Sequence, residues 1–148
     1  MAKMQLRILT SDSVKLDEPV DFIIMRCLLD EMGDHSAMGE IGVLPGHMPM
    51  SGVLGINPLR IYNDGTERVA ALFGGVVTVK DNVVTMMTEK ALWPDEIDAE
   101  KAKAEHDEAE AAINAVGDSN GEALRLGKIA MLRASVQMEV SQVKSGRK

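Results

Sequence analysis

The sequence predicts a β + α protein, in which a flattened β-sandwich or barrel precedes an antiparallel two-helix hairpin. As far as Trp93, short apolar runs rich in β-branched residues alternate with turn residues, a pattern typical of a sheet with close connections. After Pro94 the apolar spacing changes from two residues to three and four, which is the period of an α-helix. We therefore expect two units, a β-sandwich domain at residues 1–93 and a helical hairpin at residues 94–148.

The turns define where the strands lie. Asn63-Asp64-Gly65 and Asp81-Asn82 supply residues that tolerate positive φ, so each predicts a hairpin. Between the two hairpins, Gly74-Gly75 indicates a sharp corner or a bulge. The expected strands are Met4–Leu9, Val20–Leu28, Ile41–Leu44, Ser51–Leu54, Arg60–Tyr62, Thr66–Phe73, Val76–Lys80 and Val83–Thr88.

Two helices are expected after the strands. Asp95 follows a proline and precedes an acidic turn, so it is the expected N-cap of a helix that runs to about Val116. Ser119 and Glu122 have the spacing of a capping box, which predicts the start of the second helix. An apolar stripe at helical intervals predicts the buried face of that second helix: Ile129, Leu132, Val136, Val140 and Val143.

The two helices carry opposite charges. Residues 95–110 hold eight acids and two lysines, whereas residues 125–148 hold six bases and one acid. Exposed ion pairs between such helices contribute only about 0–1 kcal/mol each. The first helix also offers mostly alanine to its neighbour, and alanine buries little area. Two interpretations remain open: two solvated faces, or a hairpin held weakly enough to exchange its contact for one with another protein.

Composition narrows the classes of function. The net charge is −7, so binding to nucleic acid is not expected. The single cysteine, Cys27, agrees with a reducing compartment, and the first residues do not resemble a secretory signal. The longest uncharged stretch, Ile41–Leu59, contains three prolines and four glycines, which argues against a membrane span.

No motif predicts catalysis, and we expect neither a cofactor nor a metal ion. The three histidines and Cys27 lack the paired spacing of a zinc site, and neither G-x-S-x-G nor H-E-x-x-H occurs. Gly121–Lys128 imitates a phosphate loop, but Ile129 stands where a hydroxyl side chain should meet magnesium. An enzyme is therefore the weaker class.

One segment predicts a stiff connection. Gly39–Met50, with the sequence GEIGVLPGHMPM, combines two prolines that fix φ with glycines that turn the chain. Its aliphatic residues would anchor it to a core. A rigid exposed loop of this kind is suited to presenting a surface to a partner.

Motifs in three places, in the same order, resemble those of the ε (epsilon) subunits of F-type ATP synthases. Gly39–Pro49 is similar to the family's G-E-x-G-x-L-P-G-H-x-P signature. Gly74-Gly75, with Asp81-Asn82 and the following Val83-Val84-Thr85, resembles the second signature, and Glu96-Ile97-Asp98 opens the helical part as in the family. The resemblance covers nearly the whole chain. It implies a β-sandwich and two antiparallel helices in the rotating central stalk, without a reaction of their own.

The resemblance also implies partners. The sandwich would join the γ (gamma) subunit to the membrane c-ring in proton- or sodium-driven ATP synthesis, as a peripheral protein at the cytoplasmic face of the bacterial inner membrane. In many bacteria the helices extend toward the α and β (alpha and beta) subunits and restrain ATP hydrolysis. The expected contact residues are Gly39, Glu40, Gly42, Pro45, Gly46, His47 and Pro49. For Glu40 and His47, an ordinary role as exposed loop side chains is an equal alternative.

Two features depart from the family pattern. Residues 26–38 form a longer connection than the family's short proline-glycine turn, and they predict a protruding loop. The family's nucleotide motif, I/L-D-x-x-R-A, is degenerate here: its positions are Ile97, Asp98, Lys101 and Ala102, with Arg133 matching an arginine of the second helix. Lysine lacks the planar fork with which arginine holds a phosphate, so weak or no ATP binding is expected.

The second helix is expected to meet acidic surfaces of the β subunits through Arg125, Lys128 and Arg133. A free-standing β-sandwich binding module with a helical tail is the alternative function. It explains the composition, but not the ordered motifs. A small-ligand enzyme with a Met-rich pocket is weaker still, because no convergent polar groups accompany the methionines.

Overall fold

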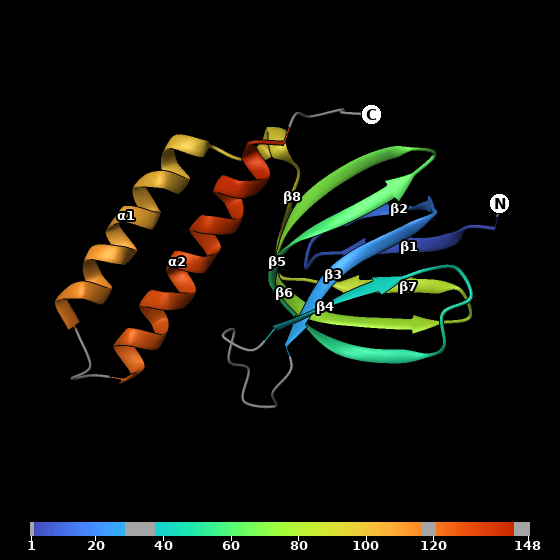
Figure 1. Cartoon of the computed structure of the whole chain (residues 1–148), viewed down its shortest axis with the longest axis horizontal. Helices are drawn as coiled ribbons and strands as arrows, with labels where there is room; N and C mark the ends of the chain where they lie inside the picture. Colours follow the sequence, from blue (N-terminus) through green and yellow to red (C-terminus); the bar gives the residue numbers. More distant parts are fainter. Residues whose placement is uncertain (1, 29–37, 117–120, 144–148) are drawn as a thin grey trace.

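The computed structural model describes residues 2–28, 38–116 and 121–143. The chain forms a curved sheet of two layers, followed by two helices that pack side by side (Figure 1). One turn of 3-10 helix, η1 (Pro94–Glu96), leads from the strands into α1 (Ala99–Val116), and α2 (Gly121–Ser141) returns beside it. The strands are β1 (Met4–Leu9), β2 (Val14–Val20), β3 (Phe22–Leu28), β4 (Met38–Val43), β5 (Met50–Asn63), β6 (Thr66–Lys80), β7 (Val83–Met87) and β8 (Ala91–Leu92).

The strands form one continuous sheet that folds over on itself. Their order is β2-β1-β7-β6-β5-β3-β4, with β8 paired to β6. All neighbouring strands are antiparallel except β1 and β7, which are parallel. The predicted sandwich followed by two helices is therefore confirmed. Its core is aliphatic and includes Leu6, Ile23, Leu54, Leu72, Val84 and Met86, all buried.

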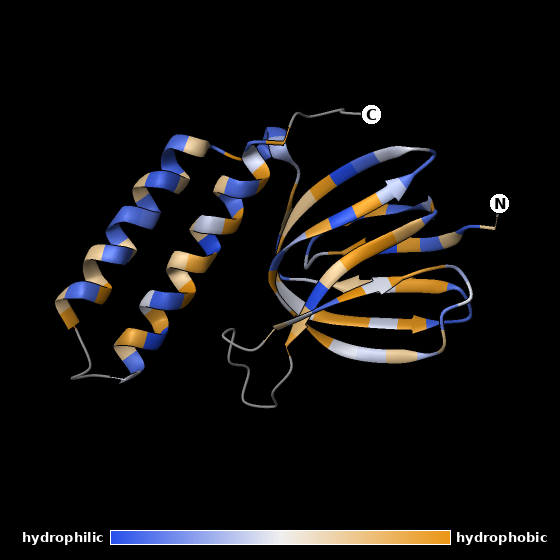
Figure 2. Cartoon of the chain, viewed as in Figure 1, coloured by the Kyte–Doolittle hydropathy of each residue, from blue (hydrophilic) through white to orange (hydrophobic). Residues whose placement is uncertain are grey.

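Alternating side chains build this core. Along β1, Met4, Leu6 and Ile8 are buried, while the residues between them reach the surface. The same alternation of apolar and polar residues is visible along several strands in Figure 2. Since successive side chains of a strand point to opposite faces, the sequence itself decides which face of each strand is covered.

Gly74 and Gly75 bend β6, so the two strands expected on either side of them are one long strand. Both residues have positive φ, +82° and +123°. A Cβ atom on Gly75 would collide with the backbone carbonyl of Met87. A side chain is excluded there on both grounds, and the bend lets β6 contribute to both layers of the sandwich.

β5 is likewise one strand, although Ser51–Leu54 and Arg60–Tyr62 were expected to be separate. The ladder between β3 and β5 is interrupted between the pairs Ile24–Arg60 and Cys27–Leu54. The side chain of the buried Asn57 supplies hydrogen bonds where the β3–β5 ladder is interrupted. Its Oδ1 accepts a hydrogen bond from the Arg26 amide (3.1 Å), and its Nδ2 donates one to the Gly55 carbonyl (2.6 Å). Pro58 lies in the same gap and pairs only with β6.

The expected strand Val20–Leu28 is in fact the end of β2 and the whole of β3. Val20 closes β2, and the chain turns at Asp21 before β3 begins at Phe22. β2 was not predicted because its sequence, VKLDEPV, lacks clean alternation. β2 is an edge strand of the sheet, where a proline and charged residues are tolerated. β4 begins at Met38, three residues before the expected start at Ile41.

The prediction that Asp95 caps the first helix is wrong. Asp95 lies within η1, Ile97 is extended (φ −100°, ψ 128°), and α1 begins at Ala99. Asp98 is the cap: its Oδ1 accepts a hydrogen bond from the Lys101 amide (3.1 Å), and its carbonyl accepts one from the Ala102 amide (3.0 Å). The extended Ile97 packs against an apolar cluster beneath α2, which explains the delayed start. The predicted cap at Ser119 falls outside the described residues.

α2 packs on the sandwich, and α1 packs on α2 (Figure 1). An apolar cluster joins Val136 and Val140 of α2 to Ile56 of β5 and to Val69, Ala71 and Phe73 of β6. The predicted stripe is confirmed, since Ile129, Leu132 and Val143 pack against the same cluster. The buried residues of α1 are alanines, Ala102 and Ala109. The hairpin is therefore attached to the sandwich through its second helix.

Candidate partner-binding surfaces and interhelical cleft

The loop between β4 and β5 lies at the end of the sandwich away from the helices (Figure 1). The backbone amide of Gly46 donates a hydrogen bond to Oδ1 of Asn82, 2.9 Å away, in the β6–β7 turn. Asn82 also donates from Nδ2 to the Lys3 carbonyl (2.7 Å), and its own carbonyl accepts from the Gln5 amide (3.0 Å). Asn82, in the β6–β7 turn, thus holds together the β4–β5 loop and the segment that leads into β1.

The loop is stiff and carries apolar side chains outward. The His47 amide donates to the Leu44 carbonyl (3.1 Å), and His47 Nδ1 lies 2.7 Å from the Met48 carbonyl, so that nitrogen must carry the proton. Leu44 and Met48 are 59% and 72% exposed. We name Leu44–Pro49 the tip loop. Sequence reasoning chose the polar His47 here and missed the two exposed apolar neighbours.

The expected contact residues do not form one patch. Gly39, Glu40 and Gly42 belong to β4, an edge strand paired to β3, whereas Pro45, Gly46, His47 and Pro49 belong to the tip loop. Glu40 lies three residues before the end of β4, which is about 10 Å along an extended strand. They form a strip from the sandwich edge to its end, and Glu40, Gly42, Gly46 and Pro49 are exposed along it.

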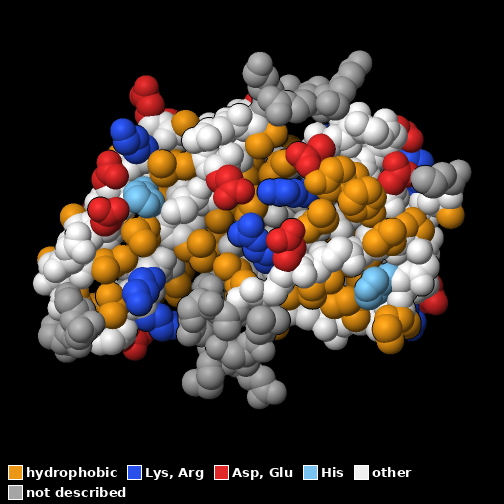
Figure 3. Space-filling model, viewed as in Figure 1, with side chains coloured by type: hydrophobic (Ala, Val, Ile, Leu, Met, Phe, Trp, Pro, Cys, Tyr) orange, Lys and Arg blue, Asp and Glu red, His pale blue; other side chains and the backbone are white. Residues whose placement is uncertain are grey.

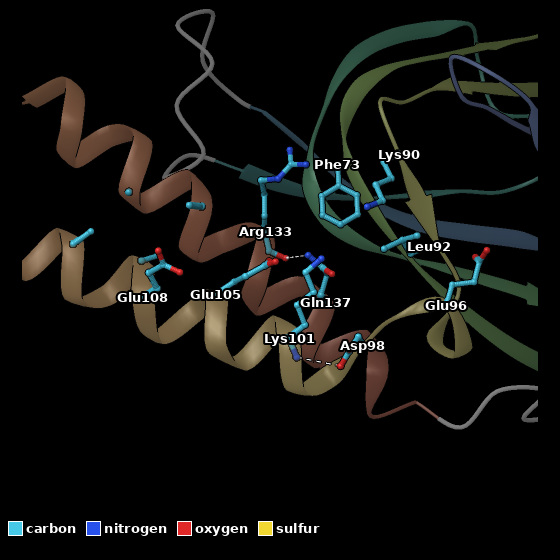
Figure 4. A pocket seen from close by; sticks show the side chains of 14 residues that line it. Phe73, Lys90, Leu92, Glu96, Asp98, Lys101, Glu105, Glu108, Arg133 and Gln137 are labelled. Atoms are coloured by element: carbon cyan, nitrogen blue, oxygen red, sulfur yellow. Dashed lines mark hydrogen bonds between the residues drawn. The ribbon is translucent and has the colours of Figure 1, made fainter.

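A second candidate site is the cleft between the two helices and the sandwich (Figure 4). Its cavity volume is about 590 Å³. Three residues of the degenerate nucleotide motif line it: Asp98, Lys101 and Arg133. The other two do not, because Ile97 packs in the apolar cluster and Ala102 is buried. Small side chains of both helices, Ala109, Ala112, Gly127 and Ala130, leave the space open.

The cleft does not suit a triphosphate. Four acids line it, Glu96, Asp98, Glu105 and Glu108, against Lys90, Lys101 and Arg133. Arg133 is already engaged: its guanidinium carbon lies 4.8 Å from the centre of the Phe73 ring, and its Nη2 lies 3.3 Å from Oε1 of Glu89. Lys90 approaches the same ring at 5.9 Å. A phosphate chain would therefore meet carboxylates where it needs free guanidinium groups.

The three basic residues expected to regulate the complex lie in different environments. Arg125 and Lys128 are exposed on α2. Arg133, two turns further along α2, is turned toward the sandwich and ion-paired to it. Only Arg125 and Lys128 are free to meet another protein while the hairpin is docked.

The start of the hairpin is tied to the sandwich by contacts that sequence reasoning missed. Lys15 of β2 forms an ion pair with Glu96 at 2.5 Å, and Glu96 also accepts a hydrogen bond from the Trp93 amide at 2.8 Å. Burial disfavours the Glu96 carboxylate, but these two hydrogen bonds outweigh it and lower the pKa of Glu96. Arg68 completes the contact, with its guanidinium 5.4 Å from the Trp93 ring and an ion pair to Glu18. Lys15 and Glu96 are 81 residues apart, which hides the pair from sequence reasoning.

Across residues 2–28, 38–116 and 121–143, no three His, Cys, Asp or Glu side chains gather closely enough to hold a metal ion. Within those same ranges, no helix has the length and apolar character needed to cross a membrane.

Comparison with known proteins places the fold in a family. A family model described as the beta-sandwich domain of the ATP synthase delta/epsilon chain matches residues 3–94. The chain is 38% identical over 120 residues to the ATP synthase epsilon chain of Geotalea uraniireducens, covering 81% of this chain and 86% of that one. It is 36% identical over 139 residues to the epsilon chain of Trichlorobacter lovleyi, covering 94% of each.

A solved structure supports the same assignment. A chain in the cryo-EM structure of the Euglena gracilis mitochondrial ATP synthase, OSCP/F1/c-ring, superposes with a TM-score of 0.76 and 27% identity, covering 97% of this chain and 83% of that one. A β-sandwich followed by a docked helix pair is thus the fold of an ATP synthase subunit. The chain belongs to the ATP synthase epsilon chain family.

Proposed function

We propose that this chain is a non-catalytic rotor subunit that couples the γ subunit to the c-ring of an F-type ATP synthase. Membership of the epsilon family carries the proposal. The solved relative supports it, since that chain comes from a structure of the F1 sector and the c-ring. In this role the protein is a peripheral protein at the cytoplasmic face of a bacterial inner membrane. The sandwich of residues 1–93 and the hairpin of residues 94–148 act as separate units.

The tip loop and the outer edge of β4 are the surfaces that we assign to the stalk and the ring. A part that transmits torque must deform little under load. The tip loop meets this need because Asn82 holds it to two other segments. Glu40 and His47 would add polar contacts at either end of the strip, while Leu44 and Met48 would supply apolar area.

Co-purification with γ tests this role. The full chain, tagged and mixed with purified γ subunit, is expected to retain γ on an affinity column and to show no ATP turnover alone. The variant Asn82→Ala should release the tip loop, while Asn114→Ala, at an exposed asparagine of α1, is the matched control. Failure of the wild-type chain to retain γ would contradict the proposed function.

We further propose that the hairpin restrains ATP hydrolysis when it leaves the sandwich. Of the two helices, α2 makes most of the contact with the sandwich, and α1 buries alanines against α2, which supports such a release. Arg125 and Lys128 are exposed and suited to acidic surfaces of the β subunits. Deleting every residue after Trp93 is expected to raise hydrolysis by the reassembled complex. An unchanged rate would show that the hairpin does not inhibit here.

A further inference from the structure

The segment between the last strand and α1 is anchored in the sandwich. Trp93 packs against the sandwich core, and the guanidinium carbon of Arg68 lies 5.4 Å from the centre of its ring. Lys15 of β2 pairs with Glu96 of η1, and only 18% of the Lys15 side chain is exposed. Glu96 also accepts the hydrogen bond from the Trp93 amide. We name Lys15, Arg68, Trp93 and Glu96 the clasp.

The two residues that follow η1 belong to the hairpin instead. Ile97 is extended and packs against the apolar cluster that α2 covers. Asp98 caps α1, because it accepts hydrogen bonds from the Lys101 and Ala102 amides. The change from one body to the other therefore falls at Ile97-Asp98, a few residues after the composition break in the sequence.

The hairpin is held to the sandwich by an apolar surface and a surface ion pair. Val136 and Val140 supply buried side chains to the apolar surface, and Arg133 pairs with Glu89 at 3.3 Å. Figure 3 shows acidic and basic side chains together over the junction of the helices and the sandwich. Since both contacts lie on α2, a rotation of the hairpin about its root separates them together and leaves the clasp intact.

We propose that the clasp keeps η1 on the sandwich while the hairpin leaves, so that the chain pivots at Ile97-Asp98. This inference rests on the proposed release of the hairpin and adds the place where the chain bends. A hinge is a short segment that absorbs a large change of φ and ψ. Rotation about ψ of Ile97 and φ of Asp98 keeps two backbone hydrogen bonds: the Ile97 amide to the Pro94 carbonyl (3.3 Å), and the Ala102 amide to the Asp98 carbonyl (3.0 Å).

A pivot at this place gives the hairpin a long reach. α1 has 18 residues and is therefore about 27 Å long. A rotation of about 60° at Ile97-Asp98 carries the far end of α1 through roughly the length of the helix. The exposed Arg125 lies near that end, in the first part of α2. Without the clasp, η1 would lengthen the tether and leave the direction of this movement undefined.

Distances between spin labels in the isolated full chain test the inference. Val136→Glu with Val140→Glu places two charges in the apolar contact of α2 and should release the hairpin. One label pair, Lys80→Cys with Asp95→Cys, joins the sandwich to η1. The other, Lys80→Cys with Lys103→Cys, joins the sandwich to α1, and all three positions are exposed. On release, the sandwich–η1 distance should stay unchanged and narrow, whereas the sandwich–α1 distance should change by roughly 10 Å or more.

Variants of the clasp supply the second part of the test. In the released chain, Lys15→Met with Arg68→Gln should broaden the sandwich–η1 distance, because η1 and Trp93 lose their charged partners. Lys101→Met with Arg125→Gln is the matched control, since it removes the same charges from exposed positions of the hairpin, and it should leave that distance narrow. Cys27 is buried, and alanine replaces it in every labelled chain.

Two results would overturn the pivot. One is a sandwich–η1 distance that changes as much as the sandwich–α1 distance, because η1 would then leave with the hairpin. The other is no change in either distance, because the apolar contact of α2 would then not hold the hairpin. A folded clasp variant with a narrow sandwich–η1 distance would overturn the clasp.

The fluorescence of Trp93, the one tryptophan of the chain, and the thermal midpoint show whether each variant is folded. If the glutamates unfold the sandwich, Val136→Ala with Val140→Ala gives the same comparison with a smaller released population. The proposed function is tested separately, since it fails when the wild-type chain does not retain γ, whatever the label distances are.

Discussion

The guanidinium carbon of Arg133 on α2 lies 4.8 Å from the centre of the Phe73 ring on β6. The same arginine pairs with Glu89 at 3.3 Å, so a cation–π contact and an ion pair lie side by side at the edge of the interhelical cleft. The arginine that matches the nucleotide motif therefore holds the hairpin against the sandwich.

Replacing Arg133 should loosen the hairpin. Arg133→Gln removes the cation–π contact, about 0.5–1 kcal/mol at an exposed site, and a surface ion pair of about 0–1 kcal/mol. A total loss of about 1 kcal/mol raises the undocked population about fivefold. Hydrogen exchange at the α2 amides should accelerate by that factor. Arg125→Gln, on the exposed side of the same helix, is the control, and equal exchange in both variants would refute the contact's role.

Gly75 should not tolerate any side chain. Gly75→Ala combines a φ of +123° with a collision against the Met87 carbonyl, and we expect a loss of about 3 kcal/mol or more in unfolding free energy. Gly46→Ala meets open space at a φ of +82°, so it should cost only about 1–2 kcal/mol. Urea midpoints compare the two variants directly. Equal losses would mean that the close approach at Gly75 is relieved elsewhere.

The Asp21 carboxylate should make the free energy of unfolding depend on pH, with a stabilising contribution that is lost in acid. The Asp64 amide donates to its carboxylate at 2.7 Å and Lys3 pairs with it at 3.0 Å, and both lower the pKa of Asp21 below its ordinary 3.8. A lowered carboxyl pKa stabilises the fold above the unfolded-state pKa, and this contribution is lost as the pH falls through the folded-state value. Asp21→Asn should therefore be less stable than the wild type at pH 7, and the difference should shrink steadily as the pH falls below 3.8. A difference that stays constant with pH would contradict this.

ATP should not stabilise the chain. A site with a dissociation constant near 0.01 mM would add about 2.7 kcal/mol at 1 mM ATP, enough to raise the thermal midpoint by several degrees. Because the cleft holds four acids and its arginine is engaged, we expect no shift at 1 mM Mg-ATP relative to magnesium alone. A rise of several degrees would show that the cleft accepts nucleotide.

Local signals in the sequence located much of the fold. β1 has the predicted bounds, because its alternation is clean. The hairpin turns form where Asp64, Asp81 and Asn82 adopt positive φ. What sequence reasoning missed depends on contacts between distant segments. Asn57 bridges the interruption between β3 and β5 by accepting a hydrogen bond from the Arg26 amide. The packing of Ile97 against the apolar cluster moves the helix cap to Asp98.

The candidate surfaces were harder to predict for the same reason. The motif located the tip loop, but not that Asn82 would fasten it or that Leu44 and Met48 would face outward. Lys15 and Glu96, which tie the start of the hairpin to the sandwich, are 81 residues apart. A contact over such a distance is not encoded in any local pattern.

Ion pumping in membrane vesicles tests the coupling role most directly. ATP synthase assembled without this chain should hydrolyse ATP without driving ion uptake, and adding back the full-length protein should restore uptake. If vesicles that lack the chain took up as many ions per ATP hydrolysed as complete vesicles, the protein would not couple the γ subunit to the c-ring.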